Sequence, residues 1–250
     1  DGGAGHRQPL DRDTAEALLR RVSGRDGRVR ELHLATTWPD AARQAERYRH
    51  GRVLLAGDAA HVHSPLGGQG LNLGLGDAMN LGWKLAAVLR GDAGEELLDS
   101  YHAERHLIGA TILDWSRAQV ALMRPGAGSR ALAAVMADLL DTTDGATYMA
   151  ERVWGVTQQL QLDGSHPFVG RSAPDVVAAD GTRMAEVLRA GRGVFWVFDP
   201  ASPLRGALDA WQPQIQCVAG LPGDGMGLAA LLVRPDGIVA WAADIGDAGA

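Results

Sequence analysis

The stretch that most constrains how this chain folds lies at residues 51–86 and reads GRVLLAGDAAHVHSPLGGQGLNLGLGDAMNLGWKLA. An apolar run at residues 53–56 ends at Gly57 and Asp58, and the apolar spacing predicts a helix from about residue 71 to residue 89. The connection between them and the start of the helix are rich in glycine: Gly67, Gly68, Gly70, Gly74 and Gly76. A buried strand that delivers one acid, followed by bare backbone at a helix N-terminus, favours a site for an anionic or polar-edged ligand.

Composition and charge exclude several classes of partner. The 250 residues are 46% apolar, which is ordinary for a globular protein of one large or two smaller domains. The net charge of −6 argues against nucleic acid or an anionic membrane as partner, because both call for a basic surface. No apolar run approaches the roughly 20 residues that span a bilayer. The single cysteine, Cys217, excludes a Cys-x-x-Cys pair and favours a cytoplasmic location.

The residues before the central stretch predict only short elements. A capping-box pattern at residues 13–16 predicts a surface helix that stops at Gly24. Alternating apolar residues at 29–37 predict a strand. Residues 41–49 are charged and predict a helical turn or an irregular loop that Tyr48 anchors.

The residues after the central stretch divide into a helical part and a mixed part. Apolar spacing predicts helices at residues 95–123, 131–140 and 147–160. The pattern changes at residues 163–167, where we place a domain boundary. Beyond it we expect a short helix at residues 184–190 and strands at residues 194–198, 215–218, 228–233 and 238–241. This part is predicted to be a small α/β or α+β module.

Two further glycine patterns fit G-x-G-x-x-A, at residues 126–131 and 225–230. The first follows a predicted helix, whereas a dinucleotide-binding fingerprint must follow a strand. The second leads into a predicted strand, whereas the fingerprint needs a helix whose N-terminus meets the pyrophosphate. We interpret both as ordinary loops, so the sequence contains no ADP-binding βαβ unit.

Three other candidate sites are weaker. His102 and His106 are four residues apart on a helix, but no third ligand is evident, so a solvated helix face is the preferred interpretation. His61 and His63 face the same side only if their segment is extended, and no further ligand follows them. Ser64 is followed by proline and lies in no G-x-S-x-G elbow, which argues against a serine nucleophile. No metal site is predicted, and no catalytic residue is assigned.

Asp58 is the strongest candidate for a ligand contact. A lone acid at the end of a strand is usually a cap for the next segment. Here it is followed by Pro65, the glycine cluster and a helix. Backbone without side chains at Gly67, Gly68 and Gly70 costs conformational entropy, which is explained if a flat ligand must contact the main chain.

The motifs of the central stretch and its flanks resemble those of one known family. They are Gly57-Asp58-Ala59-Ala60-His61, Pro65, Gly67-Gly68-Gln69-Gly70-Leu71-Asn72, Asp77-Ala78, residues 80–85, and the flanking residues 42–45, 48–49, 98–101 and 104–105. Together they closely resemble the second flavin motif of class A flavoprotein monooxygenases, the p-hydroxybenzoate hydroxylase (PHBH) type. Within that family the fullest resemblance is to the FAD hydroxylases of aromatic polyketide biosynthesis. Their C-terminal domain is thioredoxin-like without redox cysteines, and residues 166–241 resemble it.

The resemblance implies an α/β fold class. We expect the C-terminal part of a PHBH-type FAD-binding domain, largely helical after the Gly-Asp motif, followed by a small thioredoxin-like α/β domain. The three parts would be residues 1–50, the tail of the substrate-binding domain, residues 51–162, the C-terminal part of the FAD-binding domain, and residues 163–250, a thioredoxin-like domain without Cys-x-x-Cys.

The resemblance also implies roles for residues. The acid that matches Asp58 would hold the ribityl hydroxyls of FAD. The segment Pro65, Gly67, Gly68, Gln69, Gly70, Leu71 and Asn72 would line the isoalloxazine ring. Its last three N–H groups and the helix dipole would stabilise the anionic edge of reduced flavin. NADPH would be the transient reductant of FAD, and the reduced flavin would react with oxygen to give a C4a-hydroperoxide whose distal oxygen an electron-rich phenolic ring attacks.

The sequence departs from the family in what it lacks. The adenosine-binding unit and most of the substrate-covering sheet have no counterpart among these residues. We therefore expect the chain to be the C-terminal part of a longer hydroxylase, or to take its N-terminal half from a separate chain, and to be incomplete alone. The expected partners are that half and an aromatic polyketide, and a homodimer is compatible with the resemblance.

Two function hypotheses stay open at this point. The first is an FAD- and NADPH-dependent hydroxylase of a polycyclic polyketide, to which this chain supplies the isoalloxazine and ribityl half of the FAD site. The second is a non-catalytic or degenerate flavoprotein-like module that acts as a structural partner. The intact Asp58 and the unsubstituted glycines favour the first. A thiol oxidoreductase is excluded because Cys217 is the only cysteine.

Overall fold

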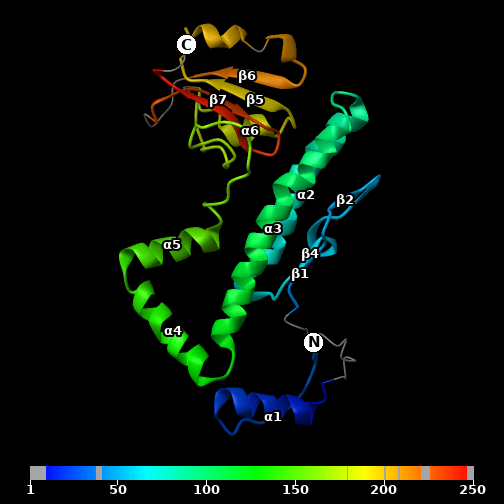
Figure 1. The fold of residues 1–250 in the computed structure, drawn as a ribbon, viewed down its shortest axis with the longest axis vertical. Coiled ribbons are helices and arrows are strands. Elements are labelled where there is room, and N and C mark those ends of the chain that lie inside the picture. Colours follow the sequence, from blue (N-terminus) through cyan, green and yellow to red (C-terminus); the bar gives the residue numbers. More distant parts are fainter. Residues whose placement is uncertain are drawn as a thin grey trace.

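The computed structural model describes residues 10–37, 41–178, 180–199, 201–207, 209–220 and 226–246. Figure 1 shows a pair of long helices beside short strands, two shorter helices that turn away from the pair, and a sheet near the C-terminal end. After the first helix, this order, from short strands to helices to sheet, follows the change in sequence pattern along the chain.

The first helix, α1 (Arg12–Ser23), buries none of its residues and ends at Gly24, which has a left-handed backbone (φ 64°), as predicted. Its N-terminal cap differs from the prediction. Asp11, not Asp13, has the extended backbone of a cap, and its Oδ1 accepts a hydrogen bond from the Thr14 N–H (2.8 Å). Asp13 lies inside the first turn instead, where its negative charge faces the positive end of the helix dipole.

The strand predicted at residues 29–37 does not form. The segment is irregular, Leu34 is 86% exposed, and within the described part of the chain no strand pairs with it. A strand must satisfy its backbone N–H and C=O groups with a neighbouring strand. Alternation of apolar residues therefore does not produce a strand here.

Residues 41–62 form two small antiparallel sheets of two strands each. β1 (Arg43–Gln44) pairs with β4 (His61–Val62), and β2 (Arg49–His50) pairs with β3 (Val53–Leu54). Tyr48 is fully buried and anchors them, as predicted. The loop or helical turn predicted at residues 41–49 is wrong where these strands form. The buried strand predicted at residues 53–56 is also wrong: only Val53 and Leu54 form a strand, and Val53 is 62% exposed.

The two long helices, α2 (Gln69–Arg90) and α3 (Glu96–Met123), form as predicted and lie side by side (Figure 1). Gly91 ends α2 with a left-handed backbone (φ 78°). A small core of buried Tyr48, Leu81, Leu98 and Tyr101 joins the helices to the short strands. This packing holds the strands against the C-terminal half of α2.

The next two helices, α4 (Ala127–Leu140) and α5 (Thr143–Trp154), have no fully buried residue. The predicted apolar stripe of α4 forms, but Leu132, Val135 and Leu139 are each about half exposed. Helix α5 ends earlier than predicted, because Gly155 takes a left-handed backbone (φ 73°).

The C-terminal part holds a mixed four-stranded sheet. Its strands are β5 (Gly193–Val197), β6 (Ile215–Ala219), β7 (Leu228–Val233) and β8 (Val239–Asp244), in the spatial order β6-β5-β7-β8. β5 and β6 are parallel, while β7 is antiparallel to both β5 and β8. The short helix α6 (Met184–Leu188) packs on a core centred on Trp196, which is fully buried. The mixed α/β fold class is therefore confirmed.

In the residues that the structure describes, no helix is both long enough and apolar enough to cross a membrane.

Candidate functional site

Asp77, a buried acid on α2, holds the Gly57-Asp58 turn in place. Gly57 has a left-handed backbone (φ 58°) that begins a short 3₁₀ turn, η1 (Gly57–Ala59). The Gly57 N–H donates to Oδ2 of Asp77 (3.0 Å). The Asp58 side chain is exposed, and no hydrogen bond or ion pair involves it within the described residues. The turn is thus fixed while its carboxylate faces solvent.

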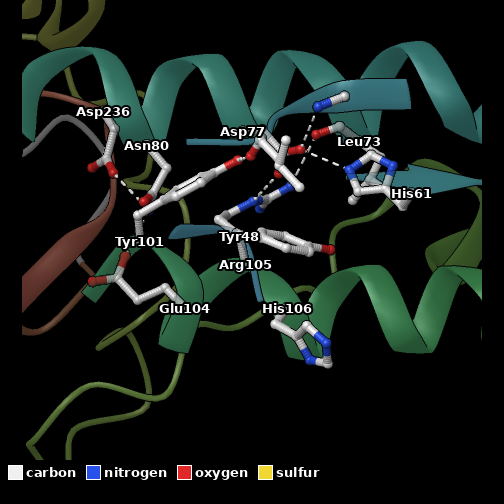
Figure 2. A network of polar contacts seen from close by, with 12 residues as sticks. Tyr48, His61, Leu73, Asp77, Asn80, Tyr101, Glu104, Arg105, His106 and Asp236 are labelled. Atoms are coloured by element: carbon white, nitrogen blue, oxygen red, sulfur yellow. Dashed lines mark hydrogen bonds and ion pairs between the residues drawn. The ribbon is translucent and has the colours of Figure 1, made fainter. Parts of the chain in front are cut away.

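Asp77 is the centre of a buried polar network, shown in Figure 2. It is completely buried, and it accepts a hydrogen bond from His61 Nε2 (2.7 Å) on Oδ2 and one from Arg105 Nε (2.9 Å) on Oδ1. Arg105 also donates to the Leu73 carbonyl (3.1 Å). Burial alone would raise the pKa of Asp77, but the donors His61, Arg105 and Gly57 outweigh it and hold that pKa below its usual value. Asp77 therefore stays ionised as a fixed acceptor.

The glycine loop changes direction at two consecutive left-handed residues. Gly67 (φ 71°) and Gly68 (φ 65°) end a short 3₁₀ turn, η2 (Leu66–Gly68), and lead into α2. Both values lie in the region that favours glycine. No side chain caps the N-terminus of α2, which leaves the positive end of the helix dipole available to a ligand.

A shallow hollow of about 370 Å³ joins the turn to the helix. Its lining is Gly57, Asp58, Gly70, Leu71, Gly74 and Leu75. A Cβ atom at Gly74 would lie 3.4 Å from the Cα atom of Gly57, in van der Waals contact, so the backbones of the turn and the helix approach each other closely here. The hollow therefore presents one exposed carboxylate beside a wall of bare backbone.

The structure brings some predicted residues together and separates others. Asp58, Gly70 and Leu71 line the hollow, while the exposed residues Pro65, Gly67, Gly68 and Asn72 lie outside its lining. Gln69 points elsewhere: it is buried, and its Nε2 donates to the Val153 carbonyl (3.0 Å) on α5. Gln69 thus ties the start of α2 to α5 and offers no side chain to the hollow.

Sequence reasoning missed the residues that support the turn: His61, Asp77 and Arg105. A signal for them was present, because Asp77 stands in the same helix stripe as Leu73 and Leu81, both buried. A charged residue in the apolar stripe of a helix indicates a buried network.

Sequence reasoning also missed a second buried network that joins the helices to the sheet. Arg234, in the turn after β7, donates from Nη1 and Nη2 to the two oxygens of Glu104 (3.0 and 2.8 Å). Lys84 Nζ lies 3.0 Å from Glu104 Oε1. Burial lowers the pKa of Lys84 to about 8, although the Glu104 charge opposes this. Asp236, in the same turn, accepts from Trp83 Nε1 (3.1 Å) on α2.

The two helix histidines are not on a solvated face, so that interpretation was wrong. His102 and His106 are partly buried, and their rings lie 5.7 and 5.4 Å from the ring of Tyr48. The Tyr48 N–H donates to Nδ1 of His102 (3.4 Å). Burial lowers the pKa of His102, as does the nearby His106. In the described part of the chain, no cluster of side chains is suited to hold a metal ion.

Comparison with known proteins identifies the family. Residues 2–116 match the FAD binding domain, and residues 166–250 match the C-terminal domain of aromatic-ring hydroxylases. Over 248 residues the chain is 42% identical to the 12-dehydrotetracycline 5-monooxygenase/anhydrotetracycline 6-monooxygenase of Streptomyces rimosus, covering 96% of this chain and 49% of that protein. The chain belongs to the family of FAD-dependent aromatic-ring hydroxylases. This confirms the resemblance to class A flavoprotein monooxygenases.

Other members of this hydroxylase family agree in structure and differ in activity. The solved anhydrotetracycline hydroxylase OxyS from Streptomyces rimosus has a TM-score of 0.88 at 40% identity, covering 96% of this chain and 51% of that one. A dialkyldecalin synthase from Streptomyces rugosporus is 44% identical over 82% of this chain and 42% of its own length. The chain thus spans about half the length of these relatives. The OxyS structure confirms the expected PHBH-type fold.

The hollow at Asp58 has the features that an FAD site in this hydroxylase family needs. Its backbone wall at Gly70 and Gly74 admits a flat ring, its exposed carboxylate can accept hydrogen bonds from hydroxyl groups, and the uncapped start of α2 faces the same region. The residues present therefore fit the cofactor.

Proposed function

We propose that this chain supplies the isoalloxazine and ribityl half of the FAD site of an NADPH-dependent hydroxylase that acts on a polycyclic aromatic polyketide. The observation that carries the proposal is the hollow in which Asp58 lies beside the bare backbone of Gly70 and Gly74. When bound there and reduced, FAD would supply activated oxygen to an electron-rich ring.

The residues of this chain would bind and orient the cofactor. Asp58 would accept hydrogen bonds from ribityl hydroxyls, because its carboxylate is exposed and has no partner among the described residues. The N-terminus of α2 would stabilise negative charge on the ring, since its dipole is uncapped. Pro65, Gly67, Gly68, Gln69 and Asn72 would shape the loop around that edge.

A further part of the enzyme would complete the site. We propose that residues 1–50 end a substrate-binding domain, residues 51–162 belong to the FAD-binding domain and residues 163–250 form the thioredoxin-like domain. The relatives are about twice as long as this chain. Leu71, Leu75 and Met79 form an apolar row on α2 with exposed fractions of 74, 55 and 57%. We propose that the N-terminal half, in the same or a separate polypeptide, covers this row and binds the adenosine end of FAD.

The substrate class is proposed from the names of the relatives, and the cellular location from the composition of the chain. Relatives named anhydrotetracycline monooxygenase and hydroxylase favour a polycyclic aromatic substrate. The single cysteine favours a cytoplasmic enzyme.

A ring-forming reaction is the second candidate. It is favoured by the identity of 44% to a dialkyldecalin synthase and by a TM-score of 0.79, at 38% identity, to the Diels-Alderase PyrE3. Such a reaction gives a product of the same mass as its substrate, whereas hydroxylation adds one oxygen atom and consumes the reductant.

Mass spectrometry under ¹⁸O₂ separates the two candidates. The complete protein, purified with FAD, would be incubated with NADPH and a panel of polycyclic phenols such as anthracycline- and tetracycline-type aglycones. The hydroxylase proposal expects a product that carries one ¹⁸O atom and forms only with NADPH. An isomeric product without ¹⁸O would favour ring formation. A colourless protein that takes up no FAD would support the non-catalytic alternative and refute both.

A further inference from the structure

A further cavity in the described part of the chain lies far from the Asp58 hollow. Its volume is about 580 Å³, and it lies between the C-terminal half of α2 and the sheet, beside the loop that joins α2 to α3 near the top of Figure 1. Cavities that hold small molecules typically have volumes of roughly 300–1,000 Å³ and often lie between domains. Along α2, Ala87 in its wall is seventeen residues from Gly70, which corresponds to about 25 Å. The cavity is therefore a separate site.

The walls of this interdomain cavity are mostly apolar and include two indole rings. Trp83 comes from α2 and Trp211 from the short turn η4 (Asp209–Trp211), and Leu97 and Ile215 add aliphatic surface. Trp211 is 58% exposed, so much of its indole surface is not covered by the described part of the chain. Aromatic walls of this kind favour a planar ligand, because flat rings stack on indole with little loss of conformational freedom.

The charge of the cavity comes from one arginine. Arg90 is paired with Asp92 (2.7 Å), and Arg234 is neutralised by Glu104 and Asp236. Arg192 is half-buried at the start of β5 and donates to the neutral amide oxygen of Gln216 (2.8 Å). Among the residues that the structure describes, no carboxylate pairs with Arg192. A cation held in an apolar wall without a counter-charge favours an anionic ligand.

We propose that the interdomain cavity binds a planar aromatic anion, such as an aromatic carboxylate or sulfonate, whose ring stacks against Trp211 and Trp83 and whose anionic group pairs with Arg192. This site is distinct from the flavin hollow. The proposal does not depend on the hydroxylase activity.

The test uses the complete protein with FAD bound and two matched probes, naphthalene-2-sulfonate and neutral 2-naphthalenemethanol. Isothermal titration calorimetry measures the affinity of each. We expect the sulfonate to bind about tenfold more tightly than the alcohol, because a hydrogen bond to a charged group is stronger than one between neutral groups. The visible absorption of FAD should stay unchanged, since the cavity lies far from the flavin hollow.

Two variants with matched controls locate the binding. Trp211→Ala should weaken the binding of both probes. Trp154→Ala removes another exposed tryptophan (76%), which lies outside the cavity, and should leave the binding of both probes unchanged. Arg192→Gln should lower the affinity for the sulfonate about tenfold and leave the affinity for the alcohol unchanged. Arg189→Gln, an exposed arginine outside the lining, is its control.

A third variant fills the cavity without removing a side chain that the ligand would contact. Ala93 lies in its wall within the loop between the helices, so Ala93→Trp should abolish the binding of both probes. The proposal is overturned if neither probe binds, as would happen if another part of the complete enzyme occupies the cavity. It is equally overturned if binding persists in Ala93→Trp and Trp211→Ala, or if binding perturbs the FAD spectrum.

Discussion

At the scale of single residues, the exposed Asp58 and the buried Asp77 have different roles at the same turn. Asp77 fixes the backbone of the turn through the Gly57 N–H, its charge is balanced by Arg105, and it accepts a further hydrogen bond from His61. Asp58 is then free of structural partners among the described residues and can be replaced without loss of the fold. A substitution at Asp58 should therefore change mainly the affinity for the cofactor, whereas a substitution at Asp77 should change mainly the stability of the fold.

The variant Asp58→Ala should weaken FAD binding to the complete protein by roughly 1–3 kcal/mol, the value of one or two hydrogen bonds to a charged acceptor. Its free energy of unfolding without FAD should change by less than about 0.5 kcal/mol, because the side chain is exposed. A fluorescence titration of the apoprotein with FAD measures the first quantity. Asp114→Ala, an exposed acid on α3, is the control. Unchanged FAD affinity in Asp58→Ala would refute the assignment.

The variant Asp77→Asn should lower the free energy of unfolding by about 3–5 kcal/mol, because it leaves the buried Arg105 without its counter-charge and turns an amide donor toward other donors. Urea denaturation of the complete protein, followed by circular dichroism, measures the change. The exposed Asp114→Asn should cost less than about 0.5 kcal/mol. If both variants were equally stable, Asp77 would not support the turn.

The sequence predicted the residues that line the hollow better than the buried residues that support its turn. Asp58 and Gly70 were singled out because an acid and bare glycines are unusual in such a pattern, and Leu71 was named because of the resemblance to class A flavoprotein monooxygenases. Asp77 and Arg105 were not singled out, because their pairing joins positions 28 residues apart on two different helices. The contact depends on how α2 and α3 pack, which no local pattern specifies.

At the scale of elements, α2 carries both the Asp58 hollow and contacts with the turn between β7 and β8. Its N-terminal turn borders the hollow, and its buried face continues to Lys84, the only lysine of the chain. The long helices were predictable because their apolar spacing repeats over many turns and glycine ends α2. The two-residue strands were not, because pairing in tertiary structure, and not propensity, creates them.

The buried Lys84 gives stability an unusual dependence on pH. Its pKa is about 8 in the folded protein and 10.5 when unperturbed, so the unfolded chain holds the proton more tightly. Stability should therefore rise as pH increases above about 8, by roughly 1–2 kcal/mol between pH 7.5 and pH 9.5. Above pH 10 the trend should reverse, because burial raises the pKa of Tyr101 and that of Tyr48, which ionise first in the unfolded chain.

Urea denaturation at a series of pH values tests this dependence. The variant Lys84→Met removes the buried ammonium group while keeping an unbranched side chain, and its stability should stay flat from pH 7.5 to pH 9.5. Arg90→Met, on an exposed turn of the same helix, should keep the wild-type rise. A rise that persists in Lys84→Met would assign the effect to another group.

At the scale of the whole molecule, the turn between β7 and β8 joins the sheet to the helices. Arg234 reaches Glu104 on α3, and Asp236 reaches Trp83 on α2. Burial would raise the pKa of Glu104, but Arg234 above all, with Asn80 and Lys84, holds it below its usual value. The ion pair is therefore intact at neutral pH. The two strands that flank this turn were predicted, but the contact of the turn with the helices was not, because local sequence does not show which elements meet.

The affinity of the complete protein for FAD in Gly70→Leu, compared with Gly82→Leu, tests the central claim most directly. Both glycines lie on α2; Gly70 lines the hollow, while a side chain at Gly82 would meet open space. If this chain holds the flavin ring against bare backbone, Gly70→Leu should lose FAD at a stability close to that of Gly82→Leu, which should bind FAD like the wild type. Equal and normal FAD affinity in the two variants would contradict the placement of the ring.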